Sequence, residues 1–149
     1  MEGKNYINGA FVDGTSGDRF ESRNPANFDE ILGTFPLSSE QDVNNAVRAA
    51  KTAYDGWRRL SRIKRGEHFD EFVQLLKKDR EEISRLVTKE CGKGIVEGRA
   101  DVTEGIHMVQ YTFGTVRMPH GDVVDSEIPE KDAFMRRKQI GRASCRERV

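Results

Sequence analysis

The sequence predicts an α/β fold in which short strands open the chain and helices fill its middle. Between residues 6 and 36, short apolar stretches alternate with Gly, Asn and Pro turns, a pattern typical of β-strands. Between residues 39 and 116, apolar residues recur at steps of three and four, the spacing of one helix face. Two more short strands are predicted at 123–124 and 133–135, on either side of a polar loop.

The turns between the opening strands place them along the chain. Residues 6–12 form two strands joined by an Asn-Gly pair, which favours the type I′ turn of a β-hairpin. A strand at 20–23 stops at Asn24-Pro25, because proline has no backbone N–H to donate to a sheet. A strand at 31–35 ends at another proline. We therefore expect a small antiparallel β element before the first helix.

Each predicted helix has a recognisable boundary. Ser39, followed three residues later by Asp42, is an acidic form of the capping box that starts a helix. Ser61 starts the second helix, and Asp79, with a glutamate three residues later, predicts a second capping box. The third helix breaks at Gly92. The long fourth helix presents one apolar stripe, made of Ile95, Val102, Ile106, Val109, Phe113 and Val116.

Composition limits the classes of partner. The 25 Lys and Arg balance the 25 Asp and Glu, so no net charge favours nucleic acid or an anionic membrane. No apolar run is long enough to span a bilayer, and the first residues form no signal region. The two cysteines lie far apart without a CxxC or metal-ligand spacing, which predicts reduced thiols and a cytoplasmic protein.

The order and spacing of several motifs resemble the N-terminal part of the aldehyde dehydrogenase superfamily, over about residues 6–138. Each motif is weak alone, but together they form a specific match. The motifs are Tyr6-Ile7-Asn8-Gly9, Asn24-Pro25, the helix from Ser39 to Trp57, Ser61-Arg62-Ile63-Lys64-Arg65-Gly66, Glu90-Cys91-Gly92-Lys93 (similar to the family's Glu-Thr-Gly-Lys), His120-Gly121, Ile128-Pro129 and Phe134-Met135-Arg136-Arg137.

This resemblance implies a fold and an activity. The chain would supply the N-terminal β element and helices of a Rossmann-like cofactor domain, which it leaves incomplete. An intact homologue would oxidise an aldehyde to a carboxylic acid with NAD or NADP, using a cysteine thiolate and a water activated by glutamate. It would be a homodimer or homotetramer. In the family those catalytic and cofactor-binding residues follow this segment, so we expect the chain to hold none, to bind no cofactor and to be inactive alone.

Three residues are candidates for a site because of the resemblance. Glu90 matches an acid that helps to bind a monovalent cation, although a solvated acid at a helix end is the simpler interpretation. Asp101 and Gly105, four residues apart on one helix face, match positions that line the substrate entrance, with an ordinary solvated face as the alternative. Cys91 matches the threonine of the family motif, and we predict a packed thiol there rather than a nucleophile.

The end of the chain departs from the family pattern. Residues 140–149 match the translation of a sequencing adapter, ATC GGA AGA GCG TCG TGT AGG GAA AGA GTG. We therefore predict a family segment at 1–138 and a non-native tail at 139–149.

Two alternatives to a general aldehyde dehydrogenase stay open. One is a semialdehyde dehydrogenase of amino-acid or sugar-acid catabolism, and the other is a non-catalytic helical interaction module.

Overall fold

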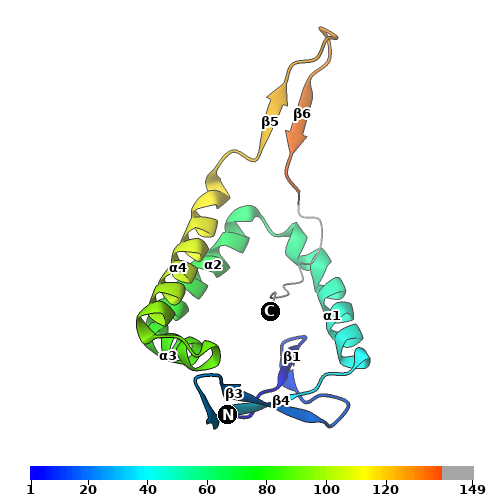
Figure 1. Ribbon diagram of the computed structural model, residues 1–149. Coiled ribbons are helices and arrows are strands. Elements are labelled where there is room, and N and C mark those ends of the chain that lie inside the picture. Colours follow the sequence, from blue (N-terminus) through cyan, green and yellow to red (C-terminus); the bar gives the residue numbers. More distant parts are fainter. Residues whose placement is uncertain (139–149) are drawn as a thin grey trace.

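The computed structural model describes residues 1–138 and shows four long helices joined to three separate hairpins (Figure 1). The helices are α1 (Glu40–Arg59), α2 (Arg62–Lys78), α3 (Arg80–Cys91) and α4 (Ile95–Gly114), followed by the short 3₁₀ helix η1 (Thr115–Arg117). The strands are β1 (Asn5–Ile7), β2 (Ala10–Val12), β3 (Arg19–Asn24), β4 (Asn27–Pro36), β5 (Gly121–Val124) and β6 (Ala133–Arg136). This mixture of helix and strand agrees with the predicted fold class, and the predicted tail at 139–149 lies outside the described residues.

The three sheets have two antiparallel strands each, β1–β2, β3–β4 and β5–β6. Asn8 and Gly9 both have positive φ, 53° and 81°, so the first hairpin has the predicted type I′ turn. Strand β4 begins at Asn27, four residues before its predicted start. It begins earlier because Asn24 pairs with Asn27 and accepts a hydrogen bond from the Ala26 N–H, which continues the ladder up to the turn.

Local capping chemistry explains two of the helix starts. At α1, the Ser39 hydroxyl accepts from the Asp42 N–H and the Asp42 carboxylate accepts from the Ser39 N–H, which confirms the predicted capping box. The Ser61 hydroxyl accepts from the Lys64 N–H at the start of α2, as predicted. The second capping box is wrong, because Asp79 also ends α2 and its φ and ψ of −98° and 12° are not the extended backbone that a capping side chain needs.

The hydrophobic core is small and lies where α2, α3 and α4 meet. Val73 of α2 and Val102 and Ile106 of α4 are buried, and the half-buried side chains around them are Leu76, Ile83, Val87 and Val109. The predicted stripe of α4 therefore faces the core at its centre. The contact between α2 and η1 requires a glycine at position 66, because a Cβ added there would lie 2.7 Å from Val116.

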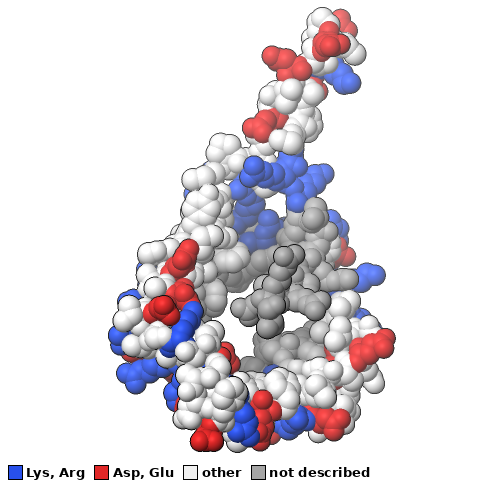
Figure 2. Space-filling view, viewed as in Figure 1, with Lys and Arg blue, Asp and Glu red and all other residues white. Residues whose placement is uncertain are grey.

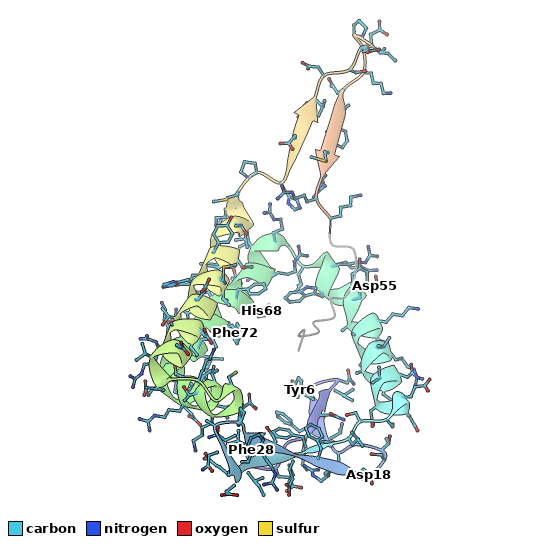
Figure 3. All side chains as sticks on the ribbon, in the orientation of Figure 1. Tyr6, Asp18, Phe28, Asp55, His68 and Phe72 are labelled. Atoms are coloured by element: carbon cyan, nitrogen blue, oxygen red, sulfur yellow. The ribbon has the colours of Figure 1, made fainter. Side chains whose placement is uncertain are left out.

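Much of the surface of α1 is exposed, and so are many large apolar side chains of the described residues. Figure 1 shows α1 across an opening from α2 and α4, with the β5–β6 hairpin projecting away from all four helices. Figure 3 shows Tyr6, Phe28 and Phe72 as side chains at the surface, and Phe28 is 70% exposed. The chain exposes 12231 Å². A compact monomer of its 16.9 kDa mass would expose roughly 7,700 Å². The described elements are therefore an open assembly with apolar faces free for further packing.

Candidate functional site

The corner between α3 and α4 is built around Gly92. This residue ends α3 in the left-handed conformation with φ of 66°, which glycine adopts without a steric penalty. A Cβ at this position would lie 2.9 Å from Pro25 Cγ and 3.1 Å from the Ala26 nitrogen, in the turn between β3 and β4. Both the backbone conformation and the close approach therefore require glycine here, and the corner rests on the β3–β4 hairpin.

Two lysines attach this corner to its surroundings. Lys89 Nζ lies 2.5 Å from Glu30 Oε1 of β4, and Glu30 also accepts from Asn24 Nδ2 at 2.8 Å. The Lys89 hydrogen bond, together with that from Asn24, lowers the pKa of Glu30. On the other side of the corner, the Lys93 ammonium pairs with the carboxylate of Asp101, two turns along α4. The corner is thus joined by ion pairs to both β4 and α4.

Glu90 lies in this corner, at the last turn of α3, and is exposed. Its carboxylate makes no ion pair or hydrogen bond with residues 1–138. Within the same residues, no group of three or more His, Cys, Asp or Glu side chains is arranged to hold a metal ion. Glu90 as a ligand of a monovalent cation therefore stays a prediction.

Asp101 and Gly105 share one exposed flank of α4, beside the buried Val102 and Ile106. Gly105 faces open space, with no heavy atom within 4 Å of an added Cβ. Asp101 is paired with Lys93, so this flank carries an ion pair rather than a single negative charge. The role of Lys93 was not predicted from the sequence. Because Lys93 precedes α4 and lies eight residues from Asp101, the spacing of a helix gave no signal for this pair.

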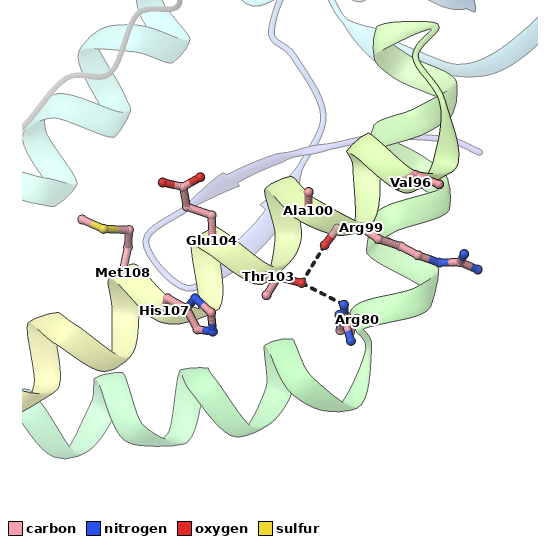
Figure 4. A pocket seen from close by; sticks show the side chains of 8 residues that line it. All are labelled: Arg80, Val96, Arg99, Ala100, Thr103, Glu104, His107 and Met108. Atoms are coloured by element: carbon pink, nitrogen blue, oxygen red, sulfur yellow. Dashed lines mark hydrogen bonds between the residues drawn. The ribbon is translucent and has the colours of Figure 1, made fainter.

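The opposite flank of α4 forms a shallow pocket of about 500 Å³ with α3 (Figure 4). Arg80 of α3 donates a hydrogen bond of 2.8 Å to Thr103 Oγ1, and that hydroxyl donates 2.7 Å to the Arg99 carbonyl. Beside the pocket, Arg99 makes hydrogen bonds of 3.0 and 2.7 Å to Glu81, which lower the pKa of Glu81 to about 2. Arg80, Thr103 and Arg99 are therefore held by hydrogen bonds within the two helices, and the Thr103 hydroxyl is directed to a backbone carbonyl.

The corner does not fit the phosphate-binding turn of a dinucleotide site. Such a turn follows a β-strand and leads into a helix, with glycines in the pattern G-x-G-x-x-G. Here Gly92 and Gly94 connect two helices. The Cys91 thiol at the end of α3 is exposed, so the prediction of a packed thiol is wrong. Residues 1–138 therefore offer a structural corner and two charged helix flanks.

Comparison with known proteins identifies the family of this chain. The model of the aldehyde dehydrogenase family matches residues 11–145. This chain belongs to the aldehyde dehydrogenase family. The match extends seven residues beyond Lys138, so the predicted boundary between the family segment and a non-native tail stays a prediction.

Several curated members of the aldehyde dehydrogenase family are clearly related to this chain. The malonate-semialdehyde dehydrogenase 1 of Shouchella clausii is 36% identical over 138 residues, which cover 93% of this chain and 28% of that enzyme. The alpha-ketoglutaric semialdehyde dehydrogenase of Bacillus subtilis is 35% identical and covers 88% of this chain and 26% of the enzyme. The malonate-semialdehyde dehydrogenase of Lacticaseibacillus casei is 38% identical over 139 residues. The chain spans little more than a quarter of the length of these relatives.

Solved aldehyde dehydrogenases have the same arrangement of elements. An NAD-dependent aldehyde dehydrogenase from Sinorhizobium meliloti superposes with a TM-score of 0.82 at 26% identity, over 90% of this chain and 27% of the solved chain. Betaine aldehyde dehydrogenase from Staphylococcus aureus, solved with NAD⁺, superposes with a TM-score of 0.79 at 27% identity, over 87% and 26%. The open assembly of α1, the core helices and the hairpins is therefore the arrangement found at one part of this fold. No helix within residues 1–138 combines the length and apolar character that crossing a membrane requires.

Proposed function

We propose that the protein to which this segment belongs oxidises an aldehyde to a carboxylic acid with NAD⁺ or NADP⁺, and that its substrate is a semialdehyde carrying its own carboxylate. The observation that supports this proposal is the kind of relative found. Of the three curated relatives described above, two are malonate-semialdehyde dehydrogenases and one is an alpha-ketoglutaric semialdehyde dehydrogenase. In the overall reaction the aldehyde loses a hydride to the nicotinamide, and water supplies the second oxygen of the new carboxylate.

Within this proposal, the described segment positions a cation ligand and shapes the substrate entrance. The α3–α4 corner holds Glu90, the proposed ligand of a monovalent cation, and α4 holds Asp101 and Gly105 on the flank proposed to line the substrate entrance. Because Lys93 pairs with Asp101, an entrance on this flank would present a cation as well as a carboxylate to an approaching anionic substrate. The proposal includes a homodimer or homotetramer in the cytoplasm for the whole protein, and no activity for the 149-residue chain alone.

The test compares two aldehydes of equal carbon number in the intact protein. Malonate semialdehyde carries a carboxylate and propanal does not, so their kcat/KM ratio isolates recognition of that group. NAD(P)H formation is followed at 340 nm, and we expect malonate semialdehyde to be preferred by about tenfold or more. The 149-residue chain serves as the control and should form no NAD(P)H. Equal kcat/KM values, or a preference for propanal, would remove the semialdehyde assignment, and no NAD(P)H with either aldehyde would remove the oxidation itself.

A further inference from the structure

A strongly basic hollow lies where α1 ends, α2 begins and β6 ends, far from the α3–α4 corner. It has a volume of about 480 Å³ and joins segments more than 70 residues apart in the sequence. Figure 2 shows Lys and Arg atoms gathered there, below the projecting hairpin. Among the described residues, no Asp or Glu lines it. We call this cavity the basic hollow, and its lining includes the cations Arg59, Arg62, Arg65, Arg136, Arg137 and Lys138.

Backbone carbonyls, rather than carboxylates, hold two of these guanidinium groups in place. Arg62 donates to the Thr115 carbonyl at 2.8 Å and to the Met118 carbonyl at 3.1 Å. Arg65 donates to the Leu60 carbonyl at 3.0 Å. A carbonyl orients a guanidinium without cancelling its charge, so the positive charge of both side chains remains available to an anion.

The remaining cations of the basic hollow are unpaired within the part of the chain that the structure describes. Arg59, Arg136, Arg137 and Lys138 make no ion pair there, whereas Arg58 at the same rim is bonded to Asp55 at 2.7 Å. His120, half-buried among these side chains, has its pKa lowered by burial and then by the charges of neighbouring arginines. The hollow therefore has a positive electrostatic potential that its own residues leave uncompensated.

The start of α2 gives a second and independent indication. Helix N-termini carry partial positive charge and are stabilised by anions. The first turn of α2 contains no acidic residue and instead carries Arg62, Lys64 and Arg65. Helix α1 shows the usual arrangement, with Glu40 and Asp42 in its first turn. Lys64 pairs with Glu67 at 2.9 Å, whereas Arg62 and Arg65 make no ion pair within residues 1–138. Cations at the start of a helix are unfavourable unless an anion offsets them, and for these two arginines the basic hollow is where such an anion would lie.

We propose that the basic hollow binds a small phosphate-bearing anion with at least two negative charges. Guanidinium groups match the oxygens of phosphate in pairs, and five of the six cations named above are arginines. A helix N-terminus adds backbone dipoles that favour the same ligand. The volume of the hollow is that of a small-molecule site rather than of a site for a folded partner. This site is separate from the substrate flank of α4 and does not depend on the proposed dehydrogenase activity.

Calorimetric titration of the full 149-residue chain with pyrophosphate tests the proposal. We expect saturable binding at one site. The double variant Arg59→Gln/Arg136→Gln should weaken the affinity by about tenfold or more, because both side chains line the hollow and neither makes an ion pair or hydrogen bond within residues 1–138. The matched control, Arg48→Gln/Lys51→Gln, removes two exposed cations of α1 outside the hollow and should change the affinity by less than about twofold. Circular dichroism verifies that both double variants keep their helices.

Any of four results would overturn the site. Equal weakening by the two double variants would mean general attraction between charges, as would be found for a chain without a formed hollow. Absence of saturable pyrophosphate binding would remove the site outright. Binding of an oligoglutamate peptide in place of pyrophosphate would assign the hollow to an acidic polypeptide segment instead. Loss of pyrophosphate binding in the intact protein would show that the rest of the polypeptide covers the hollow.

Discussion

Gly98 of α4 lies directly against Thr88 of α3, so close that a Cβ at residue 98 would be 2.5 Å from Thr88 Oγ1 and 2.8 Å from the Ser84 carbonyl oxygen. We predict that Gly98→Ala lowers the free energy of unfolding by about 1–3 kcal/mol, because the two helices must separate to admit a methyl group. The measurement is urea unfolding followed by circular dichroism.

Gly105 provides the matched control on the same helix. It faces open space, so Gly105→Ala meets no clash and gains helix propensity, which should raise the free energy of unfolding by up to about 1 kcal/mol. Equal effects of the two substitutions would contradict the close contact between α3 and α4.

The Thr88 hydroxyl is buried and has no hydrogen-bond partner among the described residues. Replacing an unsatisfied hydroxyl by a methyl group removes a desolvation penalty, so Thr88→Val should leave stability unchanged or raise it by about 1 kcal/mol. Thr103→Val is the contrasting variant, because it removes the bonds to Arg80 and to the Arg99 carbonyl, and it should be destabilising. A destabilised Thr88→Val protein would mean that the hydroxyl has a partner. Both values come from the same urea unfolding experiment.

The Glu81–Arg99 pair should make stability depend on pH in a defined window. The Arg99 hydrogen bonds lower the pKa of Glu81 from 4.5 to about 2 in the folded chain. A carboxyl with a lowered folded pKa stabilises the fold above its unfolded pKa, and this contribution is lost as pH falls from 4.5 toward 2. Between pH 6 and pH 3, Glu81→Gln should therefore lose less stability than the wild type. Glu82→Gln, which removes an exposed neighbour in the same helix turn, should follow the wild type. Identical pH profiles for wild type and Glu81→Gln would contradict the pair.

Backbone amides should exchange their hydrogens faster in α1 than in the core helices. Helix α1 has an exposed apolar stripe and packs only weakly on β1, whereas α2 and α4 enclose Val73 and Ile106. Local opening is easiest where few apolar contacts hold an element in place. We expect the α1 amides to exchange at least about tenfold faster than those at the centre of α4, measured by mass spectrometry on peptides. Equal protection of the two helices would show that α1 has a cover in solution.

Much of this fold could be predicted from the sequence because its boundaries depend on local chemistry. The Asn8-Gly9 turn, the Ser39 cap and the Gly92 break each act within a few residues, and each lies where it was predicted. The Asp79 box failed because the end of α2 fixes the backbone of this residue, which the local pattern does not reveal.

The charged contacts of the site could not be predicted in the same way. Lys93 meets Asp101 across a helix start, and Arg99 meets Glu81 from a different helix, so neither pair has a fixed spacing in the sequence. The exposure of the α1 stripe was equally hidden. Its apolar period is that of any buried helix, and only the structure shows that Val43, Ala46, Ala50 and Ala53 are exposed among the described residues.

The most direct test of the central claim, that this chain is the N-terminal segment of an aldehyde-oxidising enzyme, is a long-read sequence through the locus beyond the codon for Lys138. We predict that the reading frame continues there with residues other than those at 140–149, through the rest of the cofactor domain and on to the nucleophilic cysteine and the glutamate that the family resemblance implies. An authentic stop codon directly after Val149 would contradict the claim, because the expressed product would then lack the nucleophile, the base and the cofactor turn.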